Sequence, residues 1–198
     1  SILDEIRTLV KNGTYEINLI GQDLAAYGTG VDDEEIRKSL IQETGEGFSP
    51  LASLMKLISK IEGDFVVRLL YIHPDHFNFD VLEVMKEDSR FLHYFDIPFQ
   101  SGSSDIIKKM NRVGTQEMYT RMISKMREIF PDMILRTTFM TGFPGEKKKN
   151  FEETAAFLKE IKPDWSGCFD YSREDDTPAY NFKPRVFKRT AKETCGRS

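Results

Sequence analysis

The sequence has few residues of the types that bind metal ions or form disulfide bonds. Its 198 residues include two cysteines and three histidines. Cys168 and Cys195 lie far apart and form no CxxC pair, so the sequence indicates neither a disulfide framework nor a zinc site. We expect two ordinary thiols in a reducing compartment. With so few histidines, we also predict no metal ligands in this chain.

Long hydrophobic segments are absent as well. No apolar run approaches the length needed to cross a bilayer. A secretory signal needs an uninterrupted hydrophobic stretch, but charged residues interrupt Ser1–Val10. The formal net charge of -4 argues against a surface built mainly for binding phosphate backbones. We therefore predict a cytoplasmic protein that has no membrane partner.

Several common catalytic motifs are also missing. The chain contains no GxSxG elbow, no Walker loop, no HExxH helix and no GxGxxG turn. These motifs mark hydrolases, phosphate-loop enzymes and dinucleotide-binding domains. The sequence therefore gives no support to those classes.

What is present is a regular alternation of helical and strand patterns. Apolar residues at helical spacing predict the helices, and β-rich runs that end at glycine or polar residues predict the strands. Ser49 and Pro50 mark one helix start, because serine is a favoured N-cap and proline fits the first turn. The predicted helices are Ile2–Val10, Pro50–Ile61, Phe79–Lys86, Asp105–Met110, Gln116–Phe130 and Phe151–Ile161, and the predicted strands are Tyr15–Ile20, Phe65–Ile72, Tyr94–Pro98, Met133–Thr141 and Ser166–Tyr171.

This alternation predicts the α/β class. The strand at Phe65–Ile72 is nearly continuous in apolar residues, which is typical of a parallel sheet covered by helices. A closed eight-stranded barrel takes about 250 residues, so five strands predict either an open sheet or an incomplete barrel, and we predict a partial, open TIM-like barrel with its helices outside. We assign residues 1–182 to this barrel and the basic residues 183–198 to a linker. Because the chain opens on a helix, we expect at least one strand to precede it.

Polar and glycine-rich segments follow the predicted strands, where parallel α/β folds bind their ligands. Gln22 and Gln100 offer amide donors and acceptors there, although each could also cap a loop. Gly142 could let a ligand approach the backbone, or it could serve a turn that needs a positive φ. His73 could be a general base, a ligand or a structural residue.

Two arginines interrupt apolar strands. Arg68 and Arg136 would be costly to bury alone, so we expect each to meet a carboxylate of the protein or of a ligand. A position near the rim of a barrel would let one of them face a ligand cavity.

The strongest functional signal is a pair of motifs. Residues 142–146 read GFPGE after a predicted strand, and residues 98–103 read PFQSGS. Together they resemble the methylthiotransferase branch of the radical S-adenosylmethionine enzymes, and the resemblance covers nearly the whole chain. Further segments that match in the family's order are Gln22–Asp23, Tyr27–Gly28, Arg68, His73–Pro74, Met110–Arg112, Tyr171–Ser172, Thr177 and Ala179.

The resemblance implies a cofactor and the residues that hold it. In that family a four-iron four-sulfur cluster cleaves S-adenosylmethionine, and a deoxyadenosyl radical abstracts hydrogen before sulfur and methyl are installed. The cofactor supplies this chemistry, so the protein positions it and excludes water. The implied cofactor-binding residues are Gln22 near the methionine end, Gln100 and Ser101 near the ribose, Arg136 as a carboxylate partner, Thr141, Gly142 and Phe143 along the adenine, and His73.

One feature of that family does not occur in this chain. The CxxxCxxC motif that holds the cluster is absent, and two distant cysteines cannot replace three closely spaced thiolates. The simplest explanation is that the chain begins after that motif and lacks the amino-terminal cluster domain and the carboxyl-terminal TRAM domain. We therefore expect iron-sulfur clusters only in the full-length protein, and we expect this chain alone to be inactive.

The resemblance leaves the substrate open between two molecules. One is an aspartate of ribosomal protein S-twelve, and the other is an isopentenyl-adenosine of transfer RNA. Residues 71–74, the Gln22–Asp23 pair and Glu174 resemble the ribosomal-protein type, whereas residues 100–103 lean toward the transfer-RNA type. We expect ribosomal protein S-twelve or the small ribosomal subunit as partner, together with an electron-donor protein, and transfer RNA is the alternative. A non-catalytic barrel remnant that binds a nucleotide or the ribosome is a third hypothesis.

Overall fold

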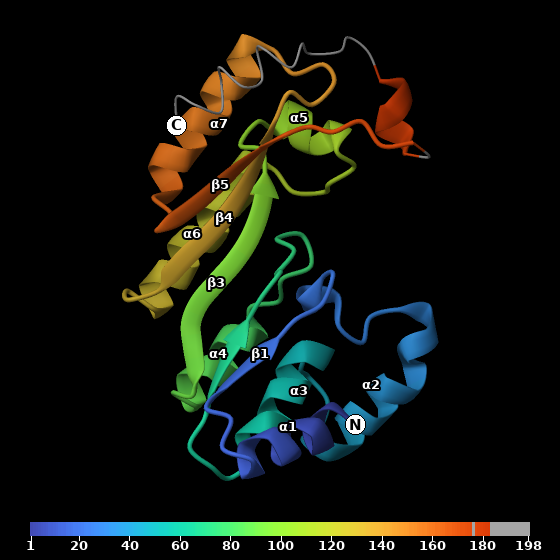
Figure 1. The fold of residues 1–198 in the computed structure, drawn as a ribbon, viewed down its shortest axis with the longest axis vertical. Coiled ribbons are helices and arrows are strands. Elements are labelled where there is room, and N and C mark those ends of the chain that lie inside the picture. Colours follow the sequence, from blue (N-terminus) through green and yellow to red (C-terminus); the bar gives the residue numbers. More distant parts are fainter. Residues whose placement is uncertain (176, 183–198) are drawn as a thin grey trace. The chain divides into compact units, whose positions relative to one another are not determined.

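A computed structural model describes residues 1–175 and 177–182 of the chain. Five parallel strands form an open sheet in the order β1-β2-β3-β4-β5, and helices connect them (Figure 1). The predicted α/β class and the open parallel arrangement are therefore confirmed. The predicted linker at 183–198 lies outside the described residues.

The chain divides into two compact units, Ser1–Asp96 and the residues from Ile97 onward. The boundary falls inside β3 (Phe91–Gln100), so each unit contains part of that strand.

No helix among the described residues is long and apolar enough to cross a membrane. The other elements of the first unit are α1 (Ile2–Lys11), β1 (Glu16–Leu19), the short 3-10 turns η1 (Leu24–Ala26) and η2 (Val31–Asp33), α2 (Glu34–Thr44), α3 (Pro50–Ser59), β2 (Val66–Leu69) and α4 (Asp80–Glu87), and those of the second are α5 (Ser104–Lys109), α6 (Gln116–Ile129), β4 (Ile134–Thr141), α7 (Lys148–Ile161), β5 (Trp165–Asp170) and η3 (Pro178–Asn181).

Helix α3 is the centre of the first unit. It packs against α1, α2 and α4, and seven of its residues from Leu51 to Ile58 are buried. A helix that is apolar on most sides needs such neighbours all round. Its start is capped as expected, because the Ser49 hydroxyl accepts the Ala52 amide at 3.3 Å and donates to Asp80 Oδ1 at 2.8 Å. The second bond ties the beginning of α3 to the beginning of α4.

Aromatic side chains fill the core of the second unit. The Phe99 ring of β3 lies 5.1 Å from Tyr119 of α6 and 5.3 Å from Phe157 of α7, measured between ring centroids. Phe139 of β4 also meets Phe157, at 6.2 Å. Helices α6 and α7 pack against each other, so both cover one face of the sheet in this unit. Along β4 and β5 the parallel register runs from Arg136 opposite Trp165 to Thr141 opposite Asp170.

The observed elements differ from the predicted ones in several places. Helix α2 has no predicted counterpart, because its sequence is mostly polar and buries Leu40 without a clear apolar stripe. Strand β2 ends at Leu69, and Tyr71 beyond it has a positive φ of 58°, which a strand does not accommodate. Strand β3 is longer than predicted and extends from Phe91 to Gln100.

The expectation of two ordinary thiols is wrong for Cys168. This residue lies on β5 and is disulfide-bonded. Distance along the chain cannot exclude a disulfide, because the fold decides which sulfur atoms come within bonding distance. Cys195 lies outside the described residues.

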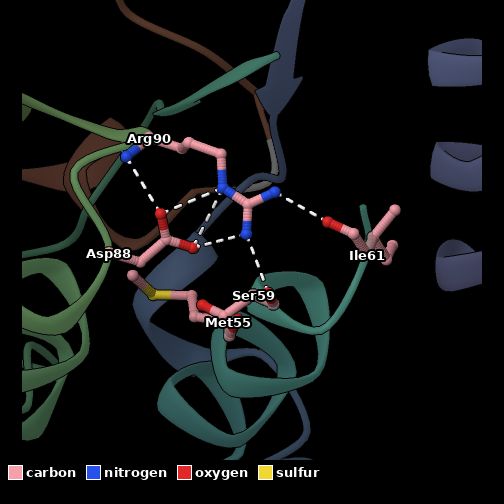
Figure 2. Close-up of polar contacts among 5 residues, drawn as sticks. All are labelled: Met55, Ser59, Ile61, Asp88 and Arg90. Carbon is pink, nitrogen blue, oxygen red and sulfur yellow. Dashed lines mark hydrogen bonds and ion pairs between the residues drawn. The ribbon is translucent and has the colours of Figure 1, made fainter. Parts of the chain in front are cut away.

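Arg90 joins the carboxyl end of α3 to the start of β3 (Figure 2). Its guanidinium donates to the carbonyl oxygens of Ile61 at 2.7 Å and Ser59 at 2.8 Å. Carbonyl groups at the end of a helix lack partners within the helix, so these bonds satisfy them. Nη2 also lies 2.7 Å from Asp88 Oδ2, and the Arg90 amide donates to Asp88 Oδ1 at 3.0 Å. One side chain thus holds a helix end, a turn and a strand start together.

This arrangement also sets the charge state of Asp88. Burial raises the pKa of its carboxyl, but hydrogen bonds from Arg90 and Ser59 and the Arg90 charge outweigh burial and lower it. A carboxyl whose folded pKa is depressed adds stability at pH values above its unfolded pKa of about 3.9. That stability is lost as the pH falls through the folded pKa.

We predict that Arg90→Met lowers the free energy of unfolding by about 3 kcal/mol at neutral pH, because Asp88, the Ser59 carbonyl at the end of α3 and the Ile61 carbonyl just beyond it lose their donor. Urea denaturation followed by circular dichroism measures this change. As a control, Arg121→Met removes the exposed ion pair with Glu117 and should cost less than about 1 kcal/mol. Equal losses in the two variants, or a loss at Arg90 that does not shrink below about pH 4, would contradict the interpretation.

Candidate functional site

The predicted cofactor-binding residues fall in both units. Gln22 and His73 belong to the first unit. The others, which belong to the second unit, are Gln100, Ser101, Arg136, Thr141, Gly142 and Phe143. The surroundings of each group of residues are therefore given by contacts within its own unit.

A groove of about 800 Å³ opens at the strand ends of the second unit. Gln100 is the last residue of β3, Phe143 follows β4 and Tyr171 follows β5. Of the predicted cofactor-binding residues, Gln100 and Phe143 line this groove. The other lining residues are Lys108, Lys109, Met110, Asn111, Arg112, Met140, Tyr171, Thr177, Ala179 and Phe182.

The groove gathers segments that are far apart in the sequence. Met110–Arg112, Tyr171, Thr177 and Ala179, which the family resemblance includes, all line it. Sequence reasoning did not single out the neighbouring lysines of α5 or Phe182. The lysines directly precede Met110, so their position beside a matching segment was the available signal. For Phe182 the sequence carried no comparable signal.

The backbone at the rim of the groove is unusual. Gln100 has a φ of 68° and Asn111 a φ of 59°. A left-handed conformation costs a residue that is not glycine about 1 kcal/mol, so the surrounding structure must hold it. One such contact is the bond from Arg112 Nη1 to the carbonyl oxygen of Pro98, at 2.8 Å. The left-handed turn ends β3 and presents Gln100 to the groove.

Aromatic rings form one wall of the groove. Phe143 is buried and meets Tyr171 edge to face at 5.3 Å and Phe182 at 6.2 Å. The Tyr171 hydroxyl is buried and has no hydrogen-bond partner among the described residues. Leaving a buried hydroxyl without a partner costs about 1 to 3 kcal/mol. This oxygen is therefore a buried polar atom of the groove with which a ligand could form a hydrogen bond.

The loop after β3 packs closely on α7. Ser101 is buried, its hydroxyl lies 3.2 Å from Thr154 Oγ1, and it accepts the Ser103 amide at 3.1 Å. A Cβ atom on Gly102 would lie 2.5 Å from Phe157 Cβ, so glycine is required for this approach. The Ser101 hydroxyl thus has partners within the protein, and its contact with the ribose stays a prediction.

The GFPGE motif builds its own turn. Gly142 has a φ of 77°, and its amide donates to the Glu146 carboxylate at 2.5 Å. Burial raises the pKa of Glu146, although the Gly142 amide opposes this shift. Thr141 is buried, and its hydroxyl lies 3.5 Å from Asp170 Oδ1. These contacts support a turn-forming role for Gly142, and its contact with the adenine stays a prediction.

The two strand arginines have different surroundings. Arg68 meets the carboxylate that the sequence led us to expect: its guanidinium bonds both Glu16 oxygens, at 2.7 Å and 3.2 Å. The Arg68 hydrogen bond lowers the pKa of Glu16, while burial opposes it. Arg136 is half-buried on β4 and alternates with the buried residues Leu135 and Thr137. Its side chain therefore belongs to the sheet face opposite the one that α6 and α7 cover.

In the first unit, His73 joins a small acid and imidazole cluster. It follows β2, and its amide donates to Asp23 Oδ1 at 3.4 Å. Asp23 Oδ2 contacts Nδ1 of His76, which the sequence analysis did not single out. The HxxH spacing of the two histidines was the signal that could have identified it. Gln22, directly before Asp23, is exposed.

Comparison with known proteins identifies the family. The model of the radical SAM superfamily matches residues 1–158. The chain belongs to the radical SAM superfamily. This result confirms the family that the motifs at 98–103 and 142–146 suggested.

Two curated relatives of this radical SAM chain carry the same name. The protein "Ribosomal protein uS12 methylthiotransferase RimO" of Treponema denticola is 54% identical over 200 residues, which cover 96% of the chain and 41% of the relative. The protein of that name from Thermotoga sp. (strain RQ2) is 37% identical over 191 residues, which also cover 96% and 41%. The chain thus spans about two fifths of the length of these relatives.

Solved radical SAM structures share the fold. Coproporphyrinogen III oxidase (HemN) from Escherichia coli matches 75% of this chain and 35% of its own, with a TM-score of 0.58 and 19% identity. The methyltransferase TsrM from Kitasatospora setae matches 90% of this chain and 32% of its own, with a TM-score of 0.58 and 13% identity. At these identities the likeness concerns the fold alone.

We predict that Glu146→Gln changes how stability depends on pH. A carboxyl whose folded pKa is raised loses its contribution as the pH rises through that value, because the buried group must ionise. Glutamine keeps an oxygen for the Gly142 amide and cannot ionise. The unfolding free energy of the wild type, relative to that of the variant, should therefore decrease as the pH rises above the unfolded pKa of about 4.3, and level off above the raised folded pKa. Urea denaturation at several pH values measures this difference.

The matched control is Glu128→Gln, which changes an exposed carboxyl of α6. That variant should follow the wild type across the same pH range. If Glu146→Gln follows the wild type as well, burial of Glu146 has no effect on stability and the interpretation of the GFPGE turn must be abandoned.

Proposed function

We propose that the longer protein carrying this chain is a radical SAM methylthiotransferase that modifies an aspartate of ribosomal protein uS12. In this proposal the chain forms part of the barrel that binds S-adenosylmethionine. The observation that carries it is a groove, lined by Gln100, Phe143 and Tyr171, in a chain 54% identical to a uS12 methylthiotransferase. A ribosomal substrate would put the reaction in the cytoplasm.

The groove suits S-adenosylmethionine in size and chemistry. Small-molecule sites typically measure about 300 to 1,000 Å³ and combine apolar walls with a few polar groups, and the groove measures about 800 Å³. The Phe143 ring offers an apolar surface for a base, the Gln100 amide can bond a hydroxyl or carboxylate, and the buried Tyr171 hydroxyl needs a partner. When bound, the cofactor would supply the radical and the methyl group. The residues of this chain would orient it and exclude water.

The iron-sulfur cluster does not fit this chain. Cluster binding requires closely spaced thiolates. The described residues include one cysteine, Cys168, and it is disulfide-bonded. Cluster ligands would therefore have to come from other parts of the longer protein, together with the contact for an electron donor. We assign no catalytic step to the present residues through the cluster.

Transfer RNA is the second candidate substrate, because three cationic side chains line the groove. Lys108, Lys109 and Arg112 could meet phosphate groups. However, Lys109 donates to the Gly145 carbonyl oxygen at 3.3 Å and Arg112 to that of Pro98 at 2.8 Å. Two of the three cations thus already have partners in the protein. The similarity to uS12 methylthiotransferases therefore favours the protein substrate.

The proposal is tested with the full-length protein after anaerobic reconstitution of its clusters. It is incubated with S-adenosylmethionine, a reductant and either uS12 or transfer RNA, and the products are examined by mass spectrometry. We expect a methylthio group on an aspartate of uS12 and none on the RNA. Modification of the RNA alone would select the second candidate. No product from either substrate, with clusters intact, would favour a non-catalytic binding module.

We predict that Gln100→Ala weakens binding of S-adenosylmethionine to the cluster-loaded full-length protein. Loss of one or two hydrogen bonds to a desolvated ligand costs about 1 to 3 kcal/mol, or between about fivefold and a hundredfold in affinity. Calorimetric titration measures the dissociation constant. Gln42→Ala, an exposed change on α2, is the control and should bind as the wild type does.

Wild-type affinity in Gln100→Ala would remove this residue from the cofactor site. Gly142→Val is not an equivalent test, because the positive φ of Gly142 would strain a valine whether or not a ligand is present. A loss of affinity in that variant must be compared with its circular dichroism spectrum before it is attributed to the cofactor.

A further inference from the structure

Three metal-ligating side chains meet at the strand ends of the first unit. Asp23 follows β1, and His73 and His76 follow β2. One potential ligand atom from each residue lies within 4.8 Å of the other two. The two loops are also joined by a backbone bond from the Leu24 amide to the Tyr71 carbonyl oxygen, at 3.0 Å. This backbone hydrogen bond holds together the two loops that carry the cluster.

The contacts within the cluster orient it. Asp23 directs Oδ1 toward the His73 amide, at 3.4 Å, and Oδ2 toward Nδ1 of His76. The two imidazole rings stack with centroids 4.8 Å apart and an interplanar angle of 26°. His73 Nδ1 accepts the Asp75 amide at 3.2 Å, so this nitrogen carries a lone pair. Both rings therefore lie beside one carboxylate.

We propose that Asp23, His73 and His76 bind a divalent metal ion of borderline softness, such as Zn²⁺. Two imidazole nitrogens and one carboxylate oxygen are a donor set that Zn²⁺, Co²⁺ and Ni²⁺ prefer over Mg²⁺ or Ca²⁺. The ion takes the place of the proton between Asp23 and His76. The lone pair of His73 Nδ1 turns from the Asp75 amide to the ion.

The required movement is small. Ligand atoms about 2.1 Å from a tetrahedral ion lie roughly 3.4 Å apart, whereas the three atoms here lie within 4.8 Å. The His76 side chain is 54% exposed, so it can rotate toward the ion without disturbing the core. Three protein ligands leave a coordination position that water can fill.

The site would join two loops that are distant in sequence. Asp23 and His73 are 50 residues apart, and the ion connects the end of β1 to the end of β2. Because the unfolded chain does not hold these residues together, binding should stabilise the folded state. The proposal requires neither S-adenosylmethionine nor the cluster, so it does not depend on the proposed function. It departs from the sequence expectation that the chain provides no metal ligands.

The test uses the 198-residue chain with one metal ion at a time. Titration with Co²⁺ is followed by visible absorption, and titration with Zn²⁺ by calorimetry and thermal unfolding. We expect one ion per chain and a higher melting temperature with Zn²⁺. Asp23→Asn and His76→Gln should each weaken binding at least about tenfold, and His73→Gln combined with His76→Gln should abolish the thermal shift.

The third histidine of the chain provides the matched control. His93 lies on β3, outside the cluster, so His93→Gln should bind both ions as the wild type does. Circular dichroism shows whether each variant is folded, and Asp23→Asn, which keeps the side-chain shape, covers the case in which a histidine variant unfolds. Three outcomes would overturn the proposal: no saturable binding, wild-type affinity in both Asp23→Asn and His76→Gln, or a thiolate-to-Co²⁺ absorption band that indicates a cysteine ligand.

Discussion

Parallel hydrogen bonding between neighbouring strands requires the chain to return to the same starting edge before each new strand. Helices make that return, so each strand is followed by a loop at its carboxyl end. In the first unit this constraint brings Asp23, after β1, beside His73, after β2. In the second unit it brings Phe143, after β4, beside Tyr171, after β5. Both candidate sites therefore result from strand direction.

Some strand-end residues form hydrogen bonds within the protein that shape the loops, and others line the groove, where a ligand could contact them. Ser101 and Gly142 are buried; Ser101 contacts Thr154 of α7 and Gly142 donates to Glu146 within its own turn, which gives the loops a defined shape. Gln100, Phe143 and Tyr171 line the groove beside them. The packed loops thus act as a support that holds the available side chains in place. A precise ligand site needs both kinds of residue, because side chains on a mobile loop would lose orientation.

The partly buried charged side chains interact with partners close to them in the fold. Arg68 and Arg90, on or beside the strands of the first unit, each bind a carboxylate through a forked contact. Such pairing removes the cost of placing a guanidinium in a partly buried position. Glu146 differs, because burial dominates and raises its pKa while a single backbone amide supports the charged form. The GFPGE turn therefore contains a carboxyl whose protonation is coupled to its burial.

The sequence by itself determined the α/β class, the five strands and the family, because these follow from apolar periodicity and from motifs that are continuous in the chain. It also indicated which strand ends carry polar side chains of the kinds that could bind a ligand. Tertiary structure decided which of them share a surface: Gln100 lines the groove, whereas the adjacent Ser101 turns into the contact with α7. It also decided that His76 joins Asp23 and that Glu34–Thr44 forms a helix. The HxxH spacing relates His76 to His73 but not to Asp23, which lies 53 residues before His76, and Glu34–Thr44 shows no clear apolar stripe, so local patterns alone did not predict either result.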